Sequence, residues 1–150
     1  MNADQPSAGR IDGREHRLSV RVYYEDTDFT GVIYHANYAR YFERGRSDFL
    51  RLAGADHCAL LALETPLAFA VARLTIDFLS PGRIDDALSV ATTFETLAGA
   101  RLTIAQSVWR ADRLLARAEV QVACIDSNGR PRRLPANFAA KLQPFLRVEG

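Results

Sequence analysis

Residues 21–37 bring together an acidic side chain, a turn and the start of a helix. Residues 21–24 continue a strand-like run, residues 26–31 have turn chemistry, and an apolar pattern typical of a helix begins after Asn37. Asp28 is therefore predicted to lie just ahead of a helix N-terminus, where free backbone N–H groups and the helix dipole favour developing negative charge. A carboxylate beside such a helix end could catalyse acyl transfer.

Asp28 also has plainer interpretations. An aspartate in a turn before a helix is more often a cap or turn residue than a catalytic one. Together with Glu25 and Asp26 it could bind a divalent cation, because such ions prefer several carboxylate oxygens. No further carboxylate of the sequence is placed to complete that site. We therefore predict no metal site.

Length and composition indicate one compact domain. The chain has 150 residues, of which 48% are hydrophobic, so it could bury roughly two thirds of its unfolded surface. Its net charge of +1 gives no support for nucleic acid or membranes as partners. We expect residues 1–17, which are polar and broken by proline and glycine, to form a flexible tail before a domain at residues 18–150.

The cysteines and the N-terminus indicate the compartment. Cys58 and Cys124 match no metal-binding spacing, and the N-terminus lacks the apolar run of a secretory signal. No segment approaches the roughly 20 apolar residues of a membrane helix. We therefore expect a cytoplasmic protein without a membrane span.

The periodicity of apolar residues changes along the chain. Residues 38–52 carry apolar side chains three and four apart, which predicts a helix of roughly 17 residues, about 25 Å long. A short second helix is predicted at residues 56–64. Strands are predicted at residues 67–79, 88–97, 101–110 and 116–124. Strands that follow one another in this way imply an antiparallel sheet, and the long helix is expected to fill its concave face.

Residues 26–30 allow one alternative, because Asp-Thr-Asp-Phe-Thr after an apolar strand matches the start of haloacid-dehalogenase-like phosphatases. Those enzymes need a lysine and a distal acidic pair. Here the only lysine is Lys141, and no acidic residue follows it before Glu149. Their parallel sheet also alternates strands with helices, whereas the strands predicted here are consecutive. We therefore reject this alternative.

The motif and the order of elements resemble the hotdog-fold acyl-CoA thioesterases of the 4-hydroxybenzoyl-CoA thioesterase type. The residues that carry the resemblance are Arg21-Val22, Thr27-Asp28, Gly31-Val32-Ile33-Tyr34 and Asn37. Within that family, residues 20–46 look most like the bacterial subgroup associated with the Tol-Pal system, through Tyr-Tyr-Glu-Asp-Thr-Asp and Tyr-His-Ala-Asn-Tyr. The similarity continues through residues 80–86 and 130–135 and covers roughly residues 18–145.

The resemblance implies an α+β hotdog fold, in which a five-stranded antiparallel sheet wraps around one long central helix. It also implies that two subunits form a continuous sheet with active sites at their interface. We expect a dimer or a dimer of dimers, which would be a homotetramer. An open sheet edge favours such pairing, since exposed edge strands are usually paired or protected.

The resemblance further implies roles for individual residues. The family's acid maps onto Asp28, and the helix-start amide that polarises the thioester carbonyl maps onto the backbone N–H of His35. The side chains of Tyr24 and His35 match positions that accompany the acid, although strand alternation would also allow Tyr23 or Tyr24 in the core. Substrate binding is expected at Tyr34, Asn37 and Arg83. The guanidinium group of arginine binds phosphates well, so Arg83 could bind the phosphates of coenzyme A. The same phosphates could also be bound by Arg130, Arg132 and Arg133.

Asp28 could supply the oxygen nucleophile in two ways. As a general base it would take a proton from water, and as a nucleophile it would form a mixed anhydride that water then opens. The sequence leaves both routes open. The His35 side chain could orient the water or the acid, or His35 could act through its backbone N–H alone.

These observations predict an acyl-CoA thioesterase that releases a free acid and coenzyme A. No cofactor is required, because coenzyme A is part of the substrate. The subgroup resemblance raises acyl carrier protein as a further partner. The alternative prediction is a non-hydrolytic scaffold that binds acyl thioesters or associates with the cell envelope.

Overall fold

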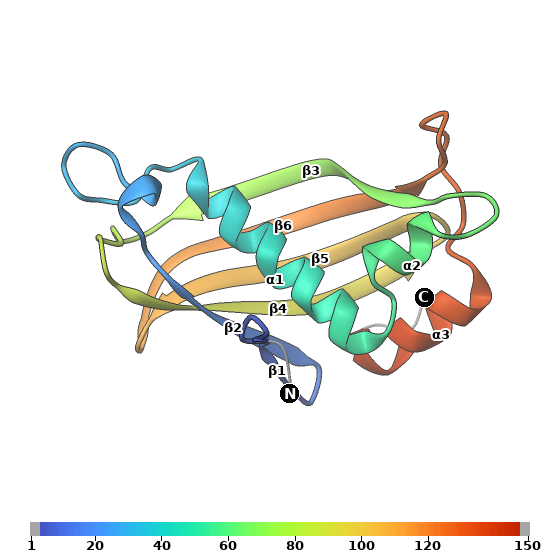
Figure 1. Ribbon diagram of the computed structural model, residues 1–150, viewed down its shortest axis with the longest axis horizontal. Coiled ribbons are helices and arrows are strands. Elements are labelled where there is room, and N and C mark those ends of the chain that lie inside the picture. Colours follow the sequence, from blue (N-terminus) through green and yellow to red (C-terminus); the bar gives the residue numbers. More distant parts are fainter. Residues whose placement is uncertain (1–3, 148–150) are drawn as a thin grey trace.

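The computed structural model describes residues 4–147 and shows one antiparallel sheet packed against a long helix (Figure 1). The sheet has six strands in the spatial order β1-β2-β4-β5-β6-β3. The strands are β1 (Arg10–Asp12), β2 (Glu15–Arg21), β3 (Ala68–Phe78), β4 (Ala87–Ala98), β5 (Arg101–Arg110) and β6 (Arg113–Ile125). The helices are α1 (Asn37–Ala53), α2 (His57–Leu61) and α3 (Ala136–Leu142), with short 3-10 helices η1 (Tyr24–Asp26) and η2 (Gln143–Phe145). The predicted α+β hotdog arrangement is confirmed.

The sheet has one strand more than the five predicted, because β1 pairs with β2 across a tight turn. Gly13 in this turn has a φ of 62°, a left-handed conformation that glycine adopts without strain. The flexible tail predicted for residues 1–17 is therefore too long, since residues 10–12 and 15–17 lie in strands. Residues 1–3 lie outside the described part of the chain.

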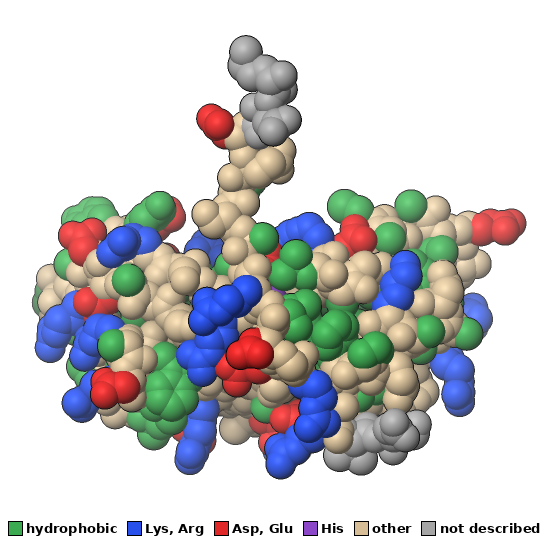
Figure 2. Space-filling model, turned by 90° about the horizontal axis from the view of Figure 1, so that it is seen from below, with side chains coloured by type: hydrophobic (Ala, Val, Ile, Leu, Met, Phe, Trp, Pro, Cys, Tyr) green, Lys and Arg blue, Asp and Glu red, His purple; other side chains and the backbone are tan. Residues whose placement is uncertain are grey.

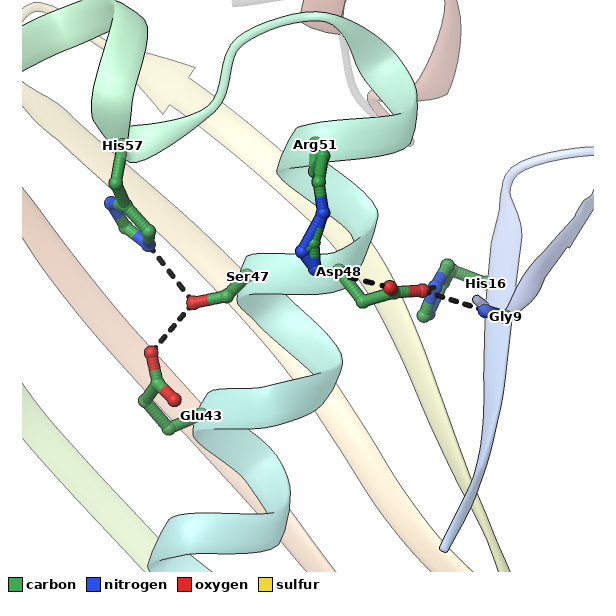
Figure 3. A network of polar contacts seen from close by, with 7 residues as sticks. All are labelled: Gly9, His16, Glu43, Ser47, Asp48, Arg51 and His57. Atoms are coloured by element: carbon green, nitrogen blue, oxygen red, sulfur yellow. Dashed lines mark hydrogen bonds and ion pairs between the residues drawn. The ribbon is translucent and has the colours of Figure 1, made fainter. Parts of the chain in front are cut away.

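His16 connects β2 to α1. Its ring is fully buried, stacks on Phe49 with 5.2 Å between centroids, and places Nε2 2.7 Å from Asp48 Oδ2 (Figure 3). The same oxygen accepts the Gly9 N–H at 2.8 Å, and Arg51 donates to the other oxygen at 3.2 Å. Both oxygens of the buried Asp48 carboxylate are thus hydrogen-bonded, which offsets the loss of hydration.

The helix α1 buries one apolar face, as its sequence predicts. The residues of that face include Tyr38, Tyr41, Phe42, Gly45 and Phe49. Gly45 lies so close to β4 that a Cβ built on it would be 2.8 Å from Thr92 Oγ1 and 3.0 Å from Val90 Cγ1. The helix has 17 residues and ends at Gly54, where φ is 87°. The predicted length of roughly 17 residues is confirmed.

The short helices α2 and α3 cover the end of the core remote from the start of α1 (Figure 1). The helix α2 is shorter than the predicted segment 56–64, and Asp56 caps it by accepting the Ala59 N–H at 3.4 Å. The helix α3, which the sequence pattern did not predict, buries Phe138 and Leu142. Within residues 4–147, no helix combines the length and the apolar character needed to span a bilayer.

Strand β3 forms one edge of the sheet and stays exposed along most of its length. A β-bulge between Val71 and Arg73 shifts its register against β6. Because of this bulge, Val71, Leu74 and Phe78 all border hollows that α1 also lines. Val71 is 51% exposed and Phe78 is 52% exposed, so this edge presents apolar surface to solvent.

The rest of the surface carries no single sign of charge. Figure 2 shows basic and acidic side chains interspersed on one face of the molecule. Among the described residues, several charged side chains are paired, such as Arg117 with Asp77 and Arg132 with Asp126. This distribution agrees with the net charge of +1.

Candidate active site

Asp28 lies in a tight loop between η1 and α1. Its carboxylate accepts the backbone N–H of Thr30 at 2.8 Å and the Thr30 hydroxyl at 2.6 Å. The Asp28 N–H donates to the Val32 carbonyl at 2.9 Å, and Gly31, with a φ of 81°, allows the chain to reverse. The two hydrogen bonds from Thr30 lower the pKa of Asp28 below its usual value. The carboxylate is therefore ionised at neutral pH.

A second loop, residues 80–86, packs against the Asp28 loop. Val32 and Arg83 form an isolated antiparallel bridge, and the Ile33 N–H donates to the Gly82 carbonyl at 2.9 Å. Gly82 has no room for a side chain, because a Cβ there would overlap Ile33. The fold thus brings together two motif segments that lie about fifty residues apart in the sequence, and it places the exposed Arg83 side chain beside the loop of Asp28.

The Asp26 carbonyl joins the Asp28 loop to the start of α1. It accepts the Tyr34 N–H at 2.9 Å and the Asn37 side-chain amide at 2.8 Å. The buried Asp26 carboxylate accepts the Tyr23 N–H at 2.8 Å. Asp26, considered in the sequence only as a metal ligand, is therefore a positioning residue, and Asn37 positions the loop as well. A buried acid within the motif cannot be recognised from spacing alone.

The start of α1 has free backbone donors. The N-cap residue, Ala36, makes no side-chain cap. Among the hydrogen bonds of the described residues, none is donated by the N–H of His35 or Ala36. These N–H groups lie at the positive end of the helix dipole. They could bind an oxyanion, as predicted for His35.

A groove runs beside this helix start. We call it the helix-start groove; its volume is about 340 Å³ and it is lined by Val32, Ile33, His35, Tyr38, Phe78, Leu79, Ser80 and Pro81. The His35 ring contacts the Tyr34 ring, with 4.5 Å between centroids, and the edge of Phe78 at 6.2 Å. An apolar groove next to free N–H groups suits an acyl group whose carbonyl must be polarised, and Val32 in its lining belongs to the loop that carries Asp28.

Tyr24, which the resemblance places among the residues that accompany the acid, is largely exposed to solvent. Its side chain is 83% exposed, and no hydrogen bond within residues 4–147 joins its hydroxyl to Asp28. The alternative that Tyr23 or Tyr24 belongs to the core is also wrong, since Tyr23 is 60% exposed. Both differences arise because β2 ends at Arg21 and the chain then turns into η1, so strand alternation no longer applies.

The other predicted residues are distributed over the molecule. Tyr34 is 48% exposed and lies beside His35. The end of β6 pairs with the first residue of β3, and the segment after β6 carries Arg130, Arg132 and Arg133. The Asp28 loop instead contacts the segment that follows the last residue of β3. One chain therefore holds these arginines and Asp28 at opposite ends of the sheet (Figure 1). Among the described residues, no group of three or more acidic, histidine or cysteine side chains could hold a metal ion.

Comparison with known proteins identifies the family. Residues 30–117 match the family model described as the Thioesterase superfamily. The acyl-CoA thioester hydrolase YbgC of Escherichia coli O6:H1 is 40% identical over 129 residues, which cover 85% of this chain and 95% of that protein. The acyl-CoA thioesterase YbgC of Haemophilus influenzae is 44% identical over 107 residues, which cover 71% of this chain and 78% of that protein.

A solved structure agrees with these sequence matches. The crystal structure of a probable thioesterase from Bartonella henselae superposes with a TM-score of 0.78 at 41% identity, covering 81% of this chain and 99% of that one. The prediction of an enzyme that hydrolyses a thioester is confirmed, and the chain belongs to the Thioesterase superfamily.

Proposed function

We propose that the protein hydrolyses acyl-CoA thioesters to a free acid and coenzyme A. The observation that carries this proposal is the ionised Asp28 carboxylate in a loop that Asp26 and Asn37 join to the free N–H groups at the start of α1. The printed names of the relatives from Escherichia coli and Haemophilus influenzae support the same substrate class.

The chemistry follows from these groups. The N–H of His35 donates a hydrogen bond to the thioester carbonyl oxygen, which becomes negatively charged as the tetrahedral intermediate forms. Asp28 then acts either as the nucleophile, giving a mixed anhydride, or as the base that activates water. A lowered pKa keeps the carboxylate ionised, as both routes require. A single turnover in water labelled with heavy oxygen distinguishes the routes, because only the nucleophilic route can place enzyme oxygen in the acid.

A second copy of the chain completes the site in this proposal. The exposed edge of β3 offers unpaired backbone groups and apolar side chains, which a partner strand would cover. Antiparallel pairing of two β3 strands would place the start of the partner's β3 beside the end of this one. Arg130, Arg132 and Arg133 of that copy would then approach the helix-start groove and could bind the phosphates of coenzyme A.

The narrower predictions remain part of the proposal. The motif of residues 20–46 supports the 4-hydroxybenzoyl-CoA thioesterase type and the Tol-Pal subgroup, and with them acyl carrier protein as a further partner. We also propose a cytoplasmic location and a dimer or homotetramer. Tyr24 and Tyr34 are exposed close to the motif and could contact substrate or a second copy.

The decisive experiment is thiol release from a panel of short, long and aromatic acyl-CoAs. Wild-type protein should release coenzyme A from at least one of them, and Asp28→Asn should not. Release by neither protein, with tight binding of acyl-CoA, would instead favour a scaffold that holds acyl thioesters without hydrolysing them. Turnover by a folded Asp28→Asn variant at the wild-type rate would contradict the role of Asp28.

A further inference from the structure

Adjoining hollows lead from the helix-start groove along the space between α1 and β3. The first hollow after the groove is lined by Ala39, Arg40, Glu43, Arg44, Arg46, Val71 and Leu74. The next shares Glu43, Arg46 and Val71 with it. The groove is lined by Tyr38 and Phe78 and the first hollow by Ala39 and Leu74, so the two follow one another along α1 and β3. We call the whole series the α1–β3 channel.

The channel ends in a small cavity of about 110 Å³ between α1, α2 and the sheet. Its floor is apolar and consists of Leu50, Phe69, Leu102, Ile104 and Val122. Its remaining lining includes Glu43, Arg46, Ser47 and His57. This volume is below the ~150 Å³ of a cavity that binds benzene, so the space better suits the narrow end of an aliphatic chain.

Three polar side chains of this cavity form a chain of hydrogen bonds (Figure 3). The Ser47 hydroxyl donates to Glu43 Oε1 at 2.6 Å, and His57 Nε2 lies 2.9 Å from the same hydroxyl oxygen. Because the single hydroxyl proton points to Glu43, His57 is the donor to Ser47. This arrangement leaves the second oxygen of Glu43 as an acceptor at the cavity.

Arg46 provides further hydrogen-bond donors at the same place, since it also lines the cavity. Its side chain is buried, with 9% of the residue exposed, and it donates to Gln106 Oε1 at 3.1 Å. Within residues 4–147 it forms no ion pair. Gln106 is itself fixed by hydrogen bonds to the Phe42 carbonyl and the Thr92 hydroxyl. A guanidinium has five N–H donors, so a buried one favours a further oxygen acceptor.

The distance along α1 sets the length of chain that reaches this cavity. Eleven residues separate His35 from Arg46, which is about 16 Å at ~1.5 Å per residue. An extended carbon chain with ~1.5 Å bonds advances about 1.3 Å per bond, so about twelve carbon atoms cover this distance. Shorter acyl groups would end within the channel.

We propose that the α1–β3 channel selects an aliphatic acyl chain of about twelve carbon atoms that carries a hydroxyl group at its far end. This inference rests on the proposed acyl-CoA thioesterase function and names its substrate class. The hydroxyl oxygen accepts a hydrogen bond from Arg46, and the hydroxyl group donates a hydrogen bond to the Glu43 carboxylate. An end group that only accepts, such as a carboxylate, would leave the Glu43 oxygen without a donor and add a like charge beside it.

The test uses two thioether analogues that cannot be hydrolysed, S-dodecyl-coenzyme A and S-(ω-hydroxydodecyl)-coenzyme A. Calorimetry gives a Kd for each, and the ratio of the two values is the readout. In the wild type the hydroxylated analogue should bind about tenfold more tightly, as expected for hydrogen bonds to charged groups. Glu43→Gln and Arg46→Met should each reduce this ratio, while the exposed control Glu119→Gln on β6 should preserve it.

The ratio separates this inference from its alternatives. A loss of stability in Arg46→Met affects both analogues alike, and the exposed Glu43 can be changed without disturbing the core. Equal Kd values in the wild type would overturn the inference, and so would a preference that both variants retain. A third thioether analogue, with a carboxylate in place of the hydroxyl, would also overturn the inference if it bound more tightly than the hydroxylated one. Hydrolysis of dodecanoyl-CoA, compared with Asp28→Asn, tests the proposed function separately, since the Kd ratio needs no turnover.

Discussion

Thr30 keeps Asp28 ionised by donating two hydrogen bonds to its carboxylate. A carboxylate that stays charged can attack a thioester carbonyl over a wide range of pH, and the helix-start N–H groups can hold the charge that develops on the carbonyl oxygen. The proposed reaction therefore needs few groups of the protein to take part in it directly. The motif residues nearest to these groups mainly position the loop.

Replacing Asp28 tests the nucleophile or base directly. Asp28→Asn keeps the size of the side chain but removes the charge, so we expect kcat/KM for acyl-CoA to fall by at least about hundredfold. Circular dichroism should show an unchanged fold. Asp12→Asn, an exposed change on β1, is the matched control and should leave kcat/KM unaltered.

Thr30 determines the acidic side of the pH profile. Because the hydrogen bonds from Thr30 hold the pKa of Asp28 below that of an ordinary aspartate, kcat/KM should stay level as the pH falls and decline only at a pH lower than an ordinary aspartate would require. Thr30→Val removes the hydroxyl donor, raises the pKa of Asp28 and should move this decline to higher pH. Thr30→Ser keeps the donor and should retain the wild-type profile. Identical profiles for Thr30→Val and the wild type would exclude this role.

The helix α1 positions the site because it lies unusually close to the sheet. Gly45 permits this approach, and the loops of residues 26–33 and 80–86 then meet at the start of the helix. Gly45→Ala would force the helix away from Thr92 and Val90, and we expect the free energy of unfolding to drop by about 1–3 kcal/mol. Urea unfolding measures this change. Arg40→Ala, on the exposed side of the helix, should show no such loss.

The elements were largely predictable because their apolar periods are regular. The helix at residues 37–53 and the strands β4, β5 and β6 lie close to their predicted bounds. The bulge in β3 was not predictable, since one extra residue leaves no signal in the local pattern. The short, polar β1 and the helix α3 carry little periodicity and were missed.

The site was predictable in part. The motif assigned Asp28 and the helix start, and the structure places them in one loop and its helix. The positioning roles of Asp26 and Asn37 depend on which backbone groups they reach, and that is decided only when the chain turns at η1. The same turn explains why strand alternation misplaced Tyr23 and Tyr24.

At the scale of the whole molecule, the exposed β3 edge determines how copies associate. Leu74→Lys places a charge on this edge, so we expect dimers to dissociate into monomers in light scattering. Leu61→Lys, a similar change at an exposed position on α2, should keep the wild-type mass. A wild-type protein that is monomeric across working concentrations would contradict the proposed assembly.

Subunit mixing tests whether one site uses two copies. The Asp28→Asn variant and an Arg130→Ala/Arg133→Ala variant should each have low activity alone. Co-expressed heterodimers contain one site with an intact Asp28 and intact arginines of the other copy, so activity should return to roughly half of the wild-type value. If the arginines serve the Asp28 of their own chain, mixing will restore nothing beyond the activity of the variants alone.

The buried contact between His16 and Asp48 has a consequence for where the folded unit begins. A chain that begins at residue 18 would keep every motif residue. It would, however, leave the Asp48 carboxylate without the His16 ring and the Gly9 N–H as hydrogen-bond partners. The aromatic face of Phe49 would also lose the ring stacked on it. The polar residues before the motif are thus part of the helix's own packing, and we expect a chain that lacks them to be less stable.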